Sequence, residues 1–462
     1  MKKRQKLLLA ATTVASLAVL TACGNGGGNT AATEADFSGE TTGTLNAWGF
    51  ENADDVGQSR LDYAAEQLSD LDIELDATAF DAQKFTAATA SGQVPDVVQM
   101  SARFVGTYAA RNLIIPLDEC LAENDVDESH WYDSVIADVS YDDSLYGIPQ
   151  FYQPPAIIVN TPLLEEAGLT PEDIDTSDRE GLLEAVTALS KETGGNPSTL
   201  GLDPSLPGQA GLWMLGAGGQ ILDDEGRPTL DNETNVETLE YLVELVDAQG
   251  GYASVKSFID TFDSFGTENQ YVKNQVAAQV NAQWYPNVLA ETSPDLTINA
   301  VPFKDSDGEN FSVASGTAFV IPVGAANPAA ACDWMLTLTS TDAWMAAGQE
   351  RADNIAAEPG RVNTGLFTGS PEADQMIREE YIGPTGSDSF DQVIDTYYDV
   401  VDYGQSYGSS AAGLEIQTEL ENAVVSALNG EKDPAQALAD GQVNAERAYD
   451  EAIALSESAT TE

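Results

Sequence analysis

The stretch that decides the fold covers residues 144–168, SLYGIPQFYQPPAIIVNTPLLEEAG. Residues 146–149 predict a short strand that stops at its proline, because proline has no backbone N–H for a continuing ladder. Residues 156–160 predict a second, apolar strand, and Thr161-Pro162 predicts the start of a helix. The two strands are joined by a stiff polar and aromatic segment, residues 150–155. This arrangement predicts a hinge between two lobes.

Length and charge narrow the class of protein. A chain of 462 residues exceeds what one hydrophobic core commonly supports, which favours two lobes. The chain has 19 Lys+Arg against 76 Asp+Glu, a formal net charge of −57. Loss of a leader that carries Lys2, Lys3, Arg4 and Lys6 would leave 15 basic residues and a net charge of −61. Such a surface repels nucleic acid and is screened at high ionic strength, so a saline or alkaline habitat is a hypothesis.

The first residues predict export. A basic start, MKKRQK, precedes an apolar run too short for a transmembrane helix, which predicts a signal peptide over residues 1–22. Leu-Thr-Ala-Cys at residues 20–23 resembles a bacterial lipobox, which implies cleavage before Cys23 and lipidation of its sulfur. The alternative is a plain secretory leader with an incidental cysteine. Residues 23–43 are rich in Gly and Thr and predict a flexible tether with a reach of about 25 Å. We therefore expect the folded part to be lipid-anchored at the outer face of the cytoplasmic membrane.

Strands and helices are expected to alternate after the tether. Strands are predicted over residues 45–50, 73–78 and 96–100, with amphipathic helices between them, which indicates a largely parallel sheet covered by helices. After the hinge the chain becomes mainly helical, with apolar stripes over residues 182–189 and 236–246. Further strands are expected over residues 277–281 and 315–322, and two helices end the chain.

Several passages, in this order, resemble one family. They are LYGIP and NTPLLEEAG around the hinge, GLWMLGAGGQILDDEGRP at residues 211–228, and GLEIQTELENAVVSALNGEKDPAQAL at residues 413–438. Together they resemble the family 1 extracellular solute-binding proteins, the maltose-binding-protein-like sugar receptors of ABC importers. The resemblance implies an α/β, two-lobe periplasmic-binding-protein-like fold of type II. Each lobe is expected to hold a mixed, mostly parallel sheet flanked by helices.

Each lobe is expected to be built from two separate segments of the chain. The first lobe is expected over residues 44–150 plus 300–332, and the second over residues 154–296 plus 333–462. Hinge crossings are expected near residues 150–155, 296–301 and 327–333.

The patterns in the sequence that resemble catalytic or metal-binding motifs lack residues that those motifs require. Residues 404–408, GQSYG, fit the G-x-S-x-G pattern of a hydrolase, but the histidine of that fold follows the serine. The only histidine here, His130, lies far upstream. Residues 305–310, DSDGEN, begin like a calcium loop but lack its glycine and its later glutamate. One histidine and two remaining cysteines leave little for a zinc site. We expect no enzyme activity, no cofactor and no bound metal.

A sugar site needs aromatic platforms for the C–H face of the ring and planar polar groups for its hydroxyls. The resemblance implies that Trp284 is such a platform, although it is also placed to be a core residue that caps the next helix. The expected ligand-binding residues are Phe50, Glu51, Asn52, Met100, Arg103, Tyr152, Gln153, Trp213, Trp284, Tyr285 and Arg361.

Structural roles compete with ligand binding at most of these positions. Residues 50–52 are also placed to cap a helix. Met100 stands where many relatives carry an aromatic residue, so stacking there is in doubt. An interlobe salt bridge is the alternative for Arg103, core packing for Trp213 and a structural ion pair for Arg361.

The two other cysteines leave two possibilities open. In an exported protein, Cys120 and Cys332 suggest a disulfide. They also fit as two small buried hydrophobic residues.

The resemblance implies an importer receptor that captures a mono- or oligosaccharide between its lobes. Its expected partners are the solute and the transmembrane subunits of an ABC permease, and the receptor is expected to be a monomer. Two alternatives remain: the same fold binding a non-sugar solute such as a polyamine, or a secreted enzyme or adhesion lipoprotein.

Overall fold

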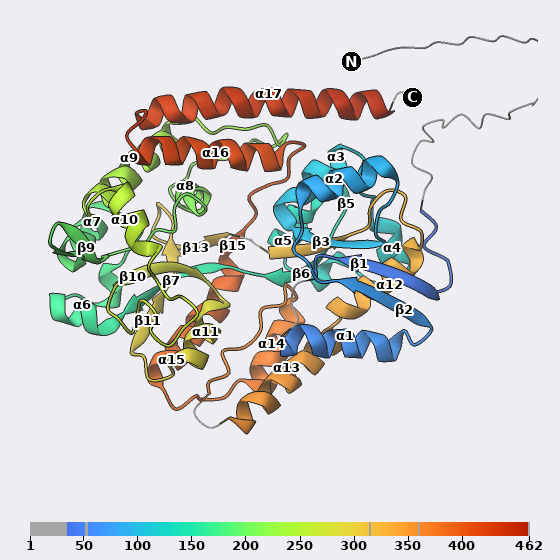
Figure 1. Ribbon diagram of the computed structural model, residues 1–462, viewed down its shortest axis with the longest axis horizontal. Helices are drawn as coiled ribbons and strands as arrows, with labels where there is room; N and C mark the ends of the chain where they lie inside the picture. Colours follow the sequence, from blue (N-terminus) through green and yellow to red (C-terminus); the bar gives the residue numbers. More distant parts are fainter. Residues whose placement is uncertain (1–34, 51–53, 314–315, 359–360, 461–462) are drawn as a thin grey trace, which may run out of the picture.

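The computed structural model describes residues 35–50, 54–313, 316–358 and 361–460, which form two lobes lying side by side (Figure 1). The expected signal peptide, Cys23 and most of the expected tether lie outside these residues. The expected tether bound at residue 43 is wrong, because Phe37 is already buried in the first-lobe core. Within the described ranges, none of the helices combines the length and the apolar character that a membrane crossing requires.

The first lobe is built on a five-stranded sheet in the order β2-β1-β3-β14-β6. Strand β1 pairs parallel with β2 and β3, whereas β14 pairs antiparallel with β3 and β6. The strands are β1 (Gly43–Trp48), β2 (Leu71–Asp76), β3 (Val97–Ser101), β14 (Gly316–Val320) and β6 (Ile148–Tyr152). The first three strands and the helices between them confirm the alternation expected from the sequence.

Strand β6 runs through Pro149 and does not stop there, so that expectation is wrong. β6 is the last strand of the sheet order, and Pro149 lies opposite Ala318 of β14. A proline is tolerated on an edge strand because its missing N–H can face away from the ladder.

Helices cover this sheet, and their apolar side chains pack with those of the strands in the core of the lobe. They are α1 (Asp55–Gln67), α2 (Ala82–Ser91), α3 (Val105–Ala110), α4 (Asp118–Glu123), α5 (Asp133–Val139) and α12 (Pro328–Thr339). The side chains of Trp334 and Met335 in α12 are fully buried in one cluster with Leu45 of β1 and Val98 of β3.

The second lobe holds a three-stranded sheet with β7 (Pro155–Asn160) at its centre, and all six residues of β7 are buried. β7 pairs antiparallel with both β10 (Ala278–Ala282) and β11 (Ile298–Val301). A mostly parallel sheet was expected in this lobe. Among the residues described, the parallel pairing beside this sheet is limited to isolated bridges, from Leu200 to Val276 just before β10 and from Asp203 to Gln279 within it. The lobe is mainly helical, as the sequence predicts.

A smaller sheet in the order β12-β13-β15 and a set of helices complete the second lobe. Its strands are β12 (Phe303–Lys304), β13 (Asn310–Val313) and β15 (Gly404–Gln405). Its helices are α6 (Thr161–Ala167), α7 (Arg179–Leu189), α8 (Ala210–Gly216), α9 (Glu233–Asp247), α10 (Tyr252–Ile259), α11 (Tyr285–Thr292) and α15 (Asp388–Val400).

The chain crosses between the sheets at places that differ in part from those expected. The first passage leads from β6 directly to β7. The second does not occur near residues 296–301, because β11, β12 and β13 all belong to the second lobe. The chain returns to the first sheet only between Val313 and Gly316.

The third passage also lies later than residues 327–333. The whole of α12 packs in the first lobe, α13 (Thr341–Ala357) packs on α1, and α14 (Pro371–Tyr381) packs on α13. The next helix, α15, packs against β11 of the second lobe. Residues 333–381 therefore add a helical layer to the first lobe, contrary to the expected boundary at residue 333.

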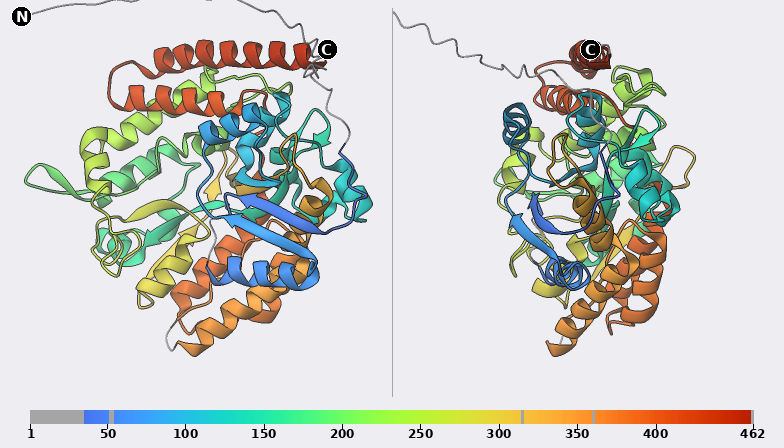
Figure 2. Two further views of the ribbon diagram at one scale, coloured as in Figure 1. Left: turned by 45° about the vertical axis from the view of Figure 1, so that its right-hand side comes forward. Right: turned by 90° about the vertical axis from the view of Figure 1, so that its right-hand side faces the viewer.

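The last two helices contact both lobes. Helices α16 (Gly413–Leu428) and α17 (Pro434–Thr460) form a hairpin along one side of the molecule, clearly separate from α13 and α14 on the other side (Figures 1 and 2). Both pack on α9 of the second lobe and on α3 of the first. The hairpin therefore links the lobes on the side away from α13.

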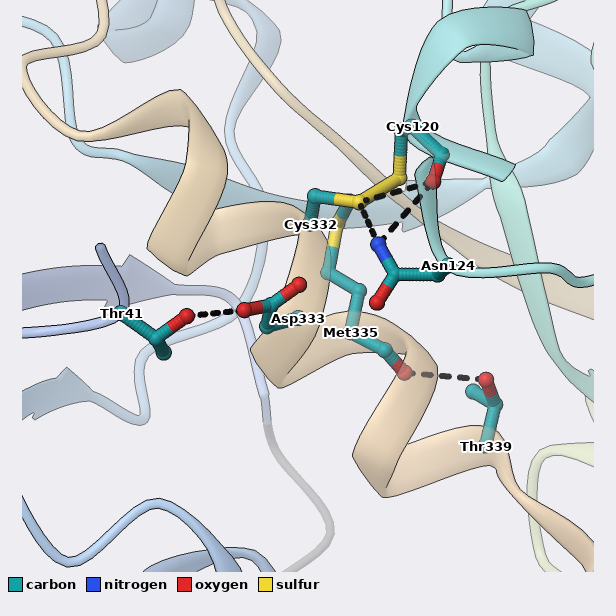
Figure 3. Close-up of a disulfide and its surroundings, with 7 residues drawn as sticks. All are labelled: Thr41, Cys120, Asn124, Cys332, Asp333, Met335 and Thr339. Carbon is teal, nitrogen blue, oxygen red and sulfur yellow. Dashed lines mark hydrogen bonds between the residues drawn. A yellow bond between two sulfur atoms is a disulfide. The ribbon is translucent and has the colours of Figure 1, made fainter. Parts of the chain in front are cut away.

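A disulfide joins Cys120 of α4 to Cys332 of α12 across 212 residues of sequence (Figure 3). Both residues are fully buried. The side-chain amide of Asn124 donates to the Cys120 carbonyl at 3.0 Å and lies 3.3 Å from the Cys332 sulfur. The bond ties the helix that follows β14 to a helix from the first third of the chain.

Removal of this disulfide should destabilise the first lobe, because a closed loop of this length restricts the unfolded chain. We expect the double variant Cys120→Ala/Cys332→Ala to lose about 2–5 kcal/mol of unfolding free energy in urea under non-reducing conditions. Treatment of the wild type with a reductant should reproduce the loss and leave the variant unchanged. Equal urea midpoints for the wild type and the double variant under non-reducing conditions would contradict the prediction.

Candidate functional site

A cleft of about 670 Å³ lies between the lobes. Its first-lobe wall comes from the start of α1 and from β3, β6, β14 and α13, and its second-lobe wall from the loop after α10 and from the start of α11. The lining residues are Asp54, Val56, Gln99, Phe151, Gln153, Phe265, Gln283, Trp284, Asn287, Thr317, Arg351 and Thr364 to Phe367.

Two aromatic rings project from the second-lobe wall. The exposed fractions of Trp284 and Phe265 are 42% and 70%, although large aromatic residues are usually buried. Their ring planes lie within 4° of parallel, with centroids 6.0 Å apart. The pair therefore offers apolar faces to a ligand in the cleft.

Tyr285 fixes the backbone beneath these rings. Its buried hydroxyl accepts a hydrogen bond from Gln270 at 2.6 Å and donates to the carbonyl of Ser264 at 3.0 Å. Ser264 precedes Phe265, and Tyr285 follows Trp284, so one hydroxyl ties the two ring-bearing segments together. Burial raises the pKa of Tyr285 to about 12, which keeps the hydroxyl protonated as a donor.

A charged cluster lies on the first-lobe wall. Arg351 of α13 donates to both carboxylate oxygens of Asp55, at 2.6 and 2.7 Å, and to Asp54 at 3.3 Å. Burial acts to raise the pKa of Asp55, but the hydrogen bonds and charge of Arg351 outweigh it and leave that pKa below its ordinary value. The Asp54 side chain is 55% exposed and also caps α1 through the N–H of Gly57. Asp54 therefore presents a fixed carboxylate at the rim of the cleft.

Comparison with known proteins identifies the class. A profile of the family described as bacterial extracellular solute-binding protein matches residues 62–357, more than half of the chain. The chain belongs to the bacterial extracellular solute-binding proteins. Its homologues in this family are solute-binding proteins and not enzymes, as the sequence predicts.

Two relatives of this solute-binding protein match over shorter stretches. It is 24% identical over 234 residues to the arabinooligosaccharide-binding protein of Bacillus subtilis (strain 168), which is 50% of this chain and 52% of the relative. It is 25% identical over 194 residues to the arabinooligosaccharide-binding protein of Halalkalibacterium halodurans, 39% of this chain and 40% of the relative. The chain thus spans about half the length of these relatives or less.

Solved structures confirm the two-lobe fold. The structure of CpMnBP1 with mannobiose bound matches with a TM-score of 0.70 and 22% identity, over 87% of this chain and 99% of that one. The GacH receptor of Streptomyces glaucescens matches with a TM-score of 0.66 and 19% identity, over 89% and 99% of the two chains.

Of the residues expected to bind ligand in this solute-binding protein, Trp284 and Gln153 line the cleft. Glu51 and Asn52 lie outside the described residues. Phe50 is buried instead in the first-lobe core, where it contacts Phe319 and Trp334.

Met100 is also a core residue, because side chains alternate along β3. Its neighbour Gln99 lines the cleft in its place. The residue type at position 100 thus reflects packing.

Three further candidates are buried in the protein. Trp213 donates from its indole to the Pro204 carbonyl at 3.2 Å and packs edge-on against Phe303. Tyr152 packs against Tyr132, and the Tyr285 hydroxyl donates to the Ser264 carbonyl beneath the rings of Trp284 and Phe265. None of the three appears among the residues that line the cleft.

The two candidate arginines lie outside the cleft. The guanidinium of Arg361 lies 3.4 Å from Glu358 and 3.6 Å from Glu291, which matches the structural ion pair considered as its alternative. Arg103 stacks on the ring of Tyr407 at 3.8 Å, so its contact with the second lobe is aromatic.

The serine of the G-x-S-x-G pattern serves an interlobe contact. The hydroxyl of Ser406 and the N–H of Tyr407 both donate to Oδ1 of Asp138 in α5. Oδ2 of Asp138 is buried and has no hydrogen-bond partner within the described ranges. Burial raises the pKa of Asp138 to about 7, although these hydrogen bonds and Arg103 act against the rise. His130 contacts the Thr339 carbonyl at 3.2 Å instead of any serine.

The raised pKa of Asp138 predicts a pH dependence of stability. Between its ordinary pKa near 4 and about 7, the folded protein retains a proton that the unfolded chain releases, so the unfolding free energy falls as pH rises. Asp138→Asn should make the unfolding free energy depend less on pH. Each unit by which the folded pKa of Asp138 exceeds the unfolded pKa corresponds to about 1.4 kcal/mol of this dependence. Urea unfolding from pH 4.5 to 8 measures it, with exposed Asp231→Asn as the control. Parallel pH profiles for wild type and Asp138→Asn would contradict the assignment.

Proposed function

We propose that this solute-binding protein is the lipid-anchored receptor of an ABC importer and captures an oligosaccharide in the interlobe cleft. The observation that carries the proposal is the pair of exposed, nearly parallel rings of Trp284 and Phe265 opposite a polar wall. Apolar ring faces suit the C–H faces of sugars, and amides and carboxylates suit their hydroxyls.

The size of the cleft favours more than one sugar unit. Its volume of about 670 Å³ lies within the range of roughly 300–1,000 Å³ that is usual for sites of drug-sized ligands. Two aromatic faces can support neighbouring units of a short chain. The relatives named for arabinooligosaccharides and the neighbour with bound mannobiose support an oligosaccharide over a single sugar.

Charge in the cleft argues against the alternative of a polyamine. Arg351 neutralises Asp55 and part of the field of Asp54, which leaves no open ring of carboxylates among the described lining residues. A second cation, Arg60, lies 5.1 Å from the centroid of the lining residue Phe151. Together, Arg60, Arg351, Asp54 and Asp55 carry no net charge, so this wall offers no electrostatic advantage to a polycation and suits a neutral sugar.

Capture is proposed to work by closure of the lobes. Each lobe supplies one wall of the site, so a ligand makes both sets of contacts only when the walls approach. Binding then shifts the population toward the closed form, which the transmembrane subunits of the permease recognise. The receptor is proposed to act as a monomer.

Anchoring is proposed through Cys23. The support is the basic start, the apolar run and the lipobox-like residues 20–23, together with membership of an extracellular family. The residues between Cys23 and Ala35 would then hold the lobes near the outer face of the cytoplasmic membrane.

Loss of the exposed indole should weaken sugar binding. We expect Trp284→Ala to reduce affinity by about 10- to 100-fold, since it removes stacking and buried area, and Trp284→Phe to lose less. Isothermal titration with mannobiose, mannotriose, arabino-oligosaccharides and spermidine measures both variants. Tight binding of spermidine alone, or equal affinities for all three proteins, would contradict the proposal.

Replacement of the lipidated cysteine should release the protein. In a bacterial host with lipoprotein processing, we expect the wild type to incorporate labelled palmitate and to partition into detergent, and Cys23→Ala to do neither. Partition of Cys23→Ala into the detergent phase would show that Cys23 is not the anchor.

A further inference from the structure

A fully buried arginine lies behind the first-lobe wall. Arg60 of α1 has no exposed surface. Its guanidinium carbon lies over the rings of Trp344 at 3.8 Å, Phe151 at 5.1 Å and Phe50 at 5.7 Å. Burial lowers its pKa to about 9, which leaves it protonated at neutral pH. A buried charge is costly, so this position requires an explanation.

The hydrogen-bond partners of Arg60 are uncharged oxygen atoms. Nε donates to the Val56 carbonyl at 3.4 Å, Nη1 to the Leu338 carbonyl at 3.5 Å, and Nη2 to Oε1 of Gln150 at 3.0 Å. The two carbonyl contacts are long, and the contact with Gln150 is the short one. Gln150 lies in β6, directly before Phe151, and is itself fully buried.

This contact fixes the orientation of the Gln150 amide. A guanidinium has donors and no acceptor, so only the amide oxygen of Gln150 can face it. The amide nitrogen must therefore point the other way. It donates to Oε1 of Gln99 at 2.8 Å and to Oγ1 of Thr317 at 3.3 Å.

The orientation of the Gln150 amide in turn determines which groups of its two partners face the cleft. Gln99 and Thr317 both line the cleft. Because the Gln99 oxygen accepts from Gln150, the group that Gln99 retains for a ligand is its NH₂. Because Thr317 uses a lone pair toward Gln150, its O–H stays available to donate.

We propose that Arg60 is a positioning residue that sets the hydrogen-bond direction of this wall, so that Gln99 and Thr317 recognise ligand oxygen atoms by donation. The inference rests on the proposed function, in which the ligand is a neutral oligosaccharide. Ring, glycosidic and hydroxyl oxygens of such a ligand are the acceptors that this wall selects. The charge of Arg60, the orientation of the Gln150 amide and the donors of Gln99 and Thr317 are thus linked through four side chains.

Gln150→Glu is the decisive variant. Its carboxylate keeps the contact with Arg60 as an ion pair but has no donor for Gln99 or Thr317. Gln99 must then turn its NH₂ inward and present its oxygen to the cleft, and the Thr317 hydroxyl must donate inward. Stability should be retained while the wall changes from donating to accepting.

The binding arm uses isothermal titration with mannobiose and arabinotriose. We expect Gln150→Glu to weaken binding by at least tenfold at an unchanged or higher melting temperature, and Arg60→Met to weaken it by about tenfold. Arg60→Lys, which keeps the positive charge and N–H donors but not the planar fork, should recover part of the loss. Phe85→Leu, a core change on another side of this lobe, controls for destabilisation alone. Wild-type affinity in Gln150→Glu would overturn the proposal.

A second arm needs no ligand and separates this inference from the proposed function. In ¹⁵N spectra, the side-chain amide signals of Gln150 are those absent from Gln150→Glu. We expect their solvent exchange to be at least tenfold faster in Arg60→Met than in wild type or Phe85→Leu. Unchanged exchange in Arg60→Met would overturn the role of Arg60, whatever the sugar titrations show. Failure of every sugar to bind wild type, with faster exchange in Arg60→Met, would refute only the proposed function.

Discussion

Two consecutive strands that belong to different sheets create the cleft. β6 is the edge strand of the first sheet and β7 is the central strand of the second, and only Gln153 and Pro154 separate them. A two-residue connection often makes a hairpin, but here β6 pairs with β14 and β7 pairs with β10 and β11. Each lobe therefore closes its own core and leaves a wall facing the other. Phe151 and Gln153 line the cleft because they lie at this junction.

Local patterns predicted the elements better than the lobe boundaries. The strands of the first lobe and the helix stripes over residues 182–189 and 236–246 follow from periodicity, which reports which face of an element is buried. It does not report against which lobe that face packs. A hinge crossing was expected near residues 327–333, yet Pro328 begins α12, whose buried face completes the first-lobe core.

The family resemblance pointed to Trp284, which follows β10 and is exposed at the cleft. The site was not predictable where a shift of one residue along a strand decides between core and cleft, as for Met100 and Gln99. Arg351 was missed for another reason. Its helix was assigned to the wrong lobe, so nothing in the sequence brought it to Asp54 and Asp55, 297 and 296 residues away.

The strongly acidic surface and the cations of the first lobe are two parts of one electrostatic arrangement. A chain with net charge −57 attracts cations, so binding of the proposed neutral ligand requires a site without this bias. Arg351 cancels carboxylate charge at the rim, and Arg60 adds positive charge behind Phe151. Because Arg60 is enclosed by rings and carbonyls, its charge is screened little by solvent or salt and acts on the cleft at any ionic strength. A surface cation would lose that influence in salt, which gives a physical reason to bury this one.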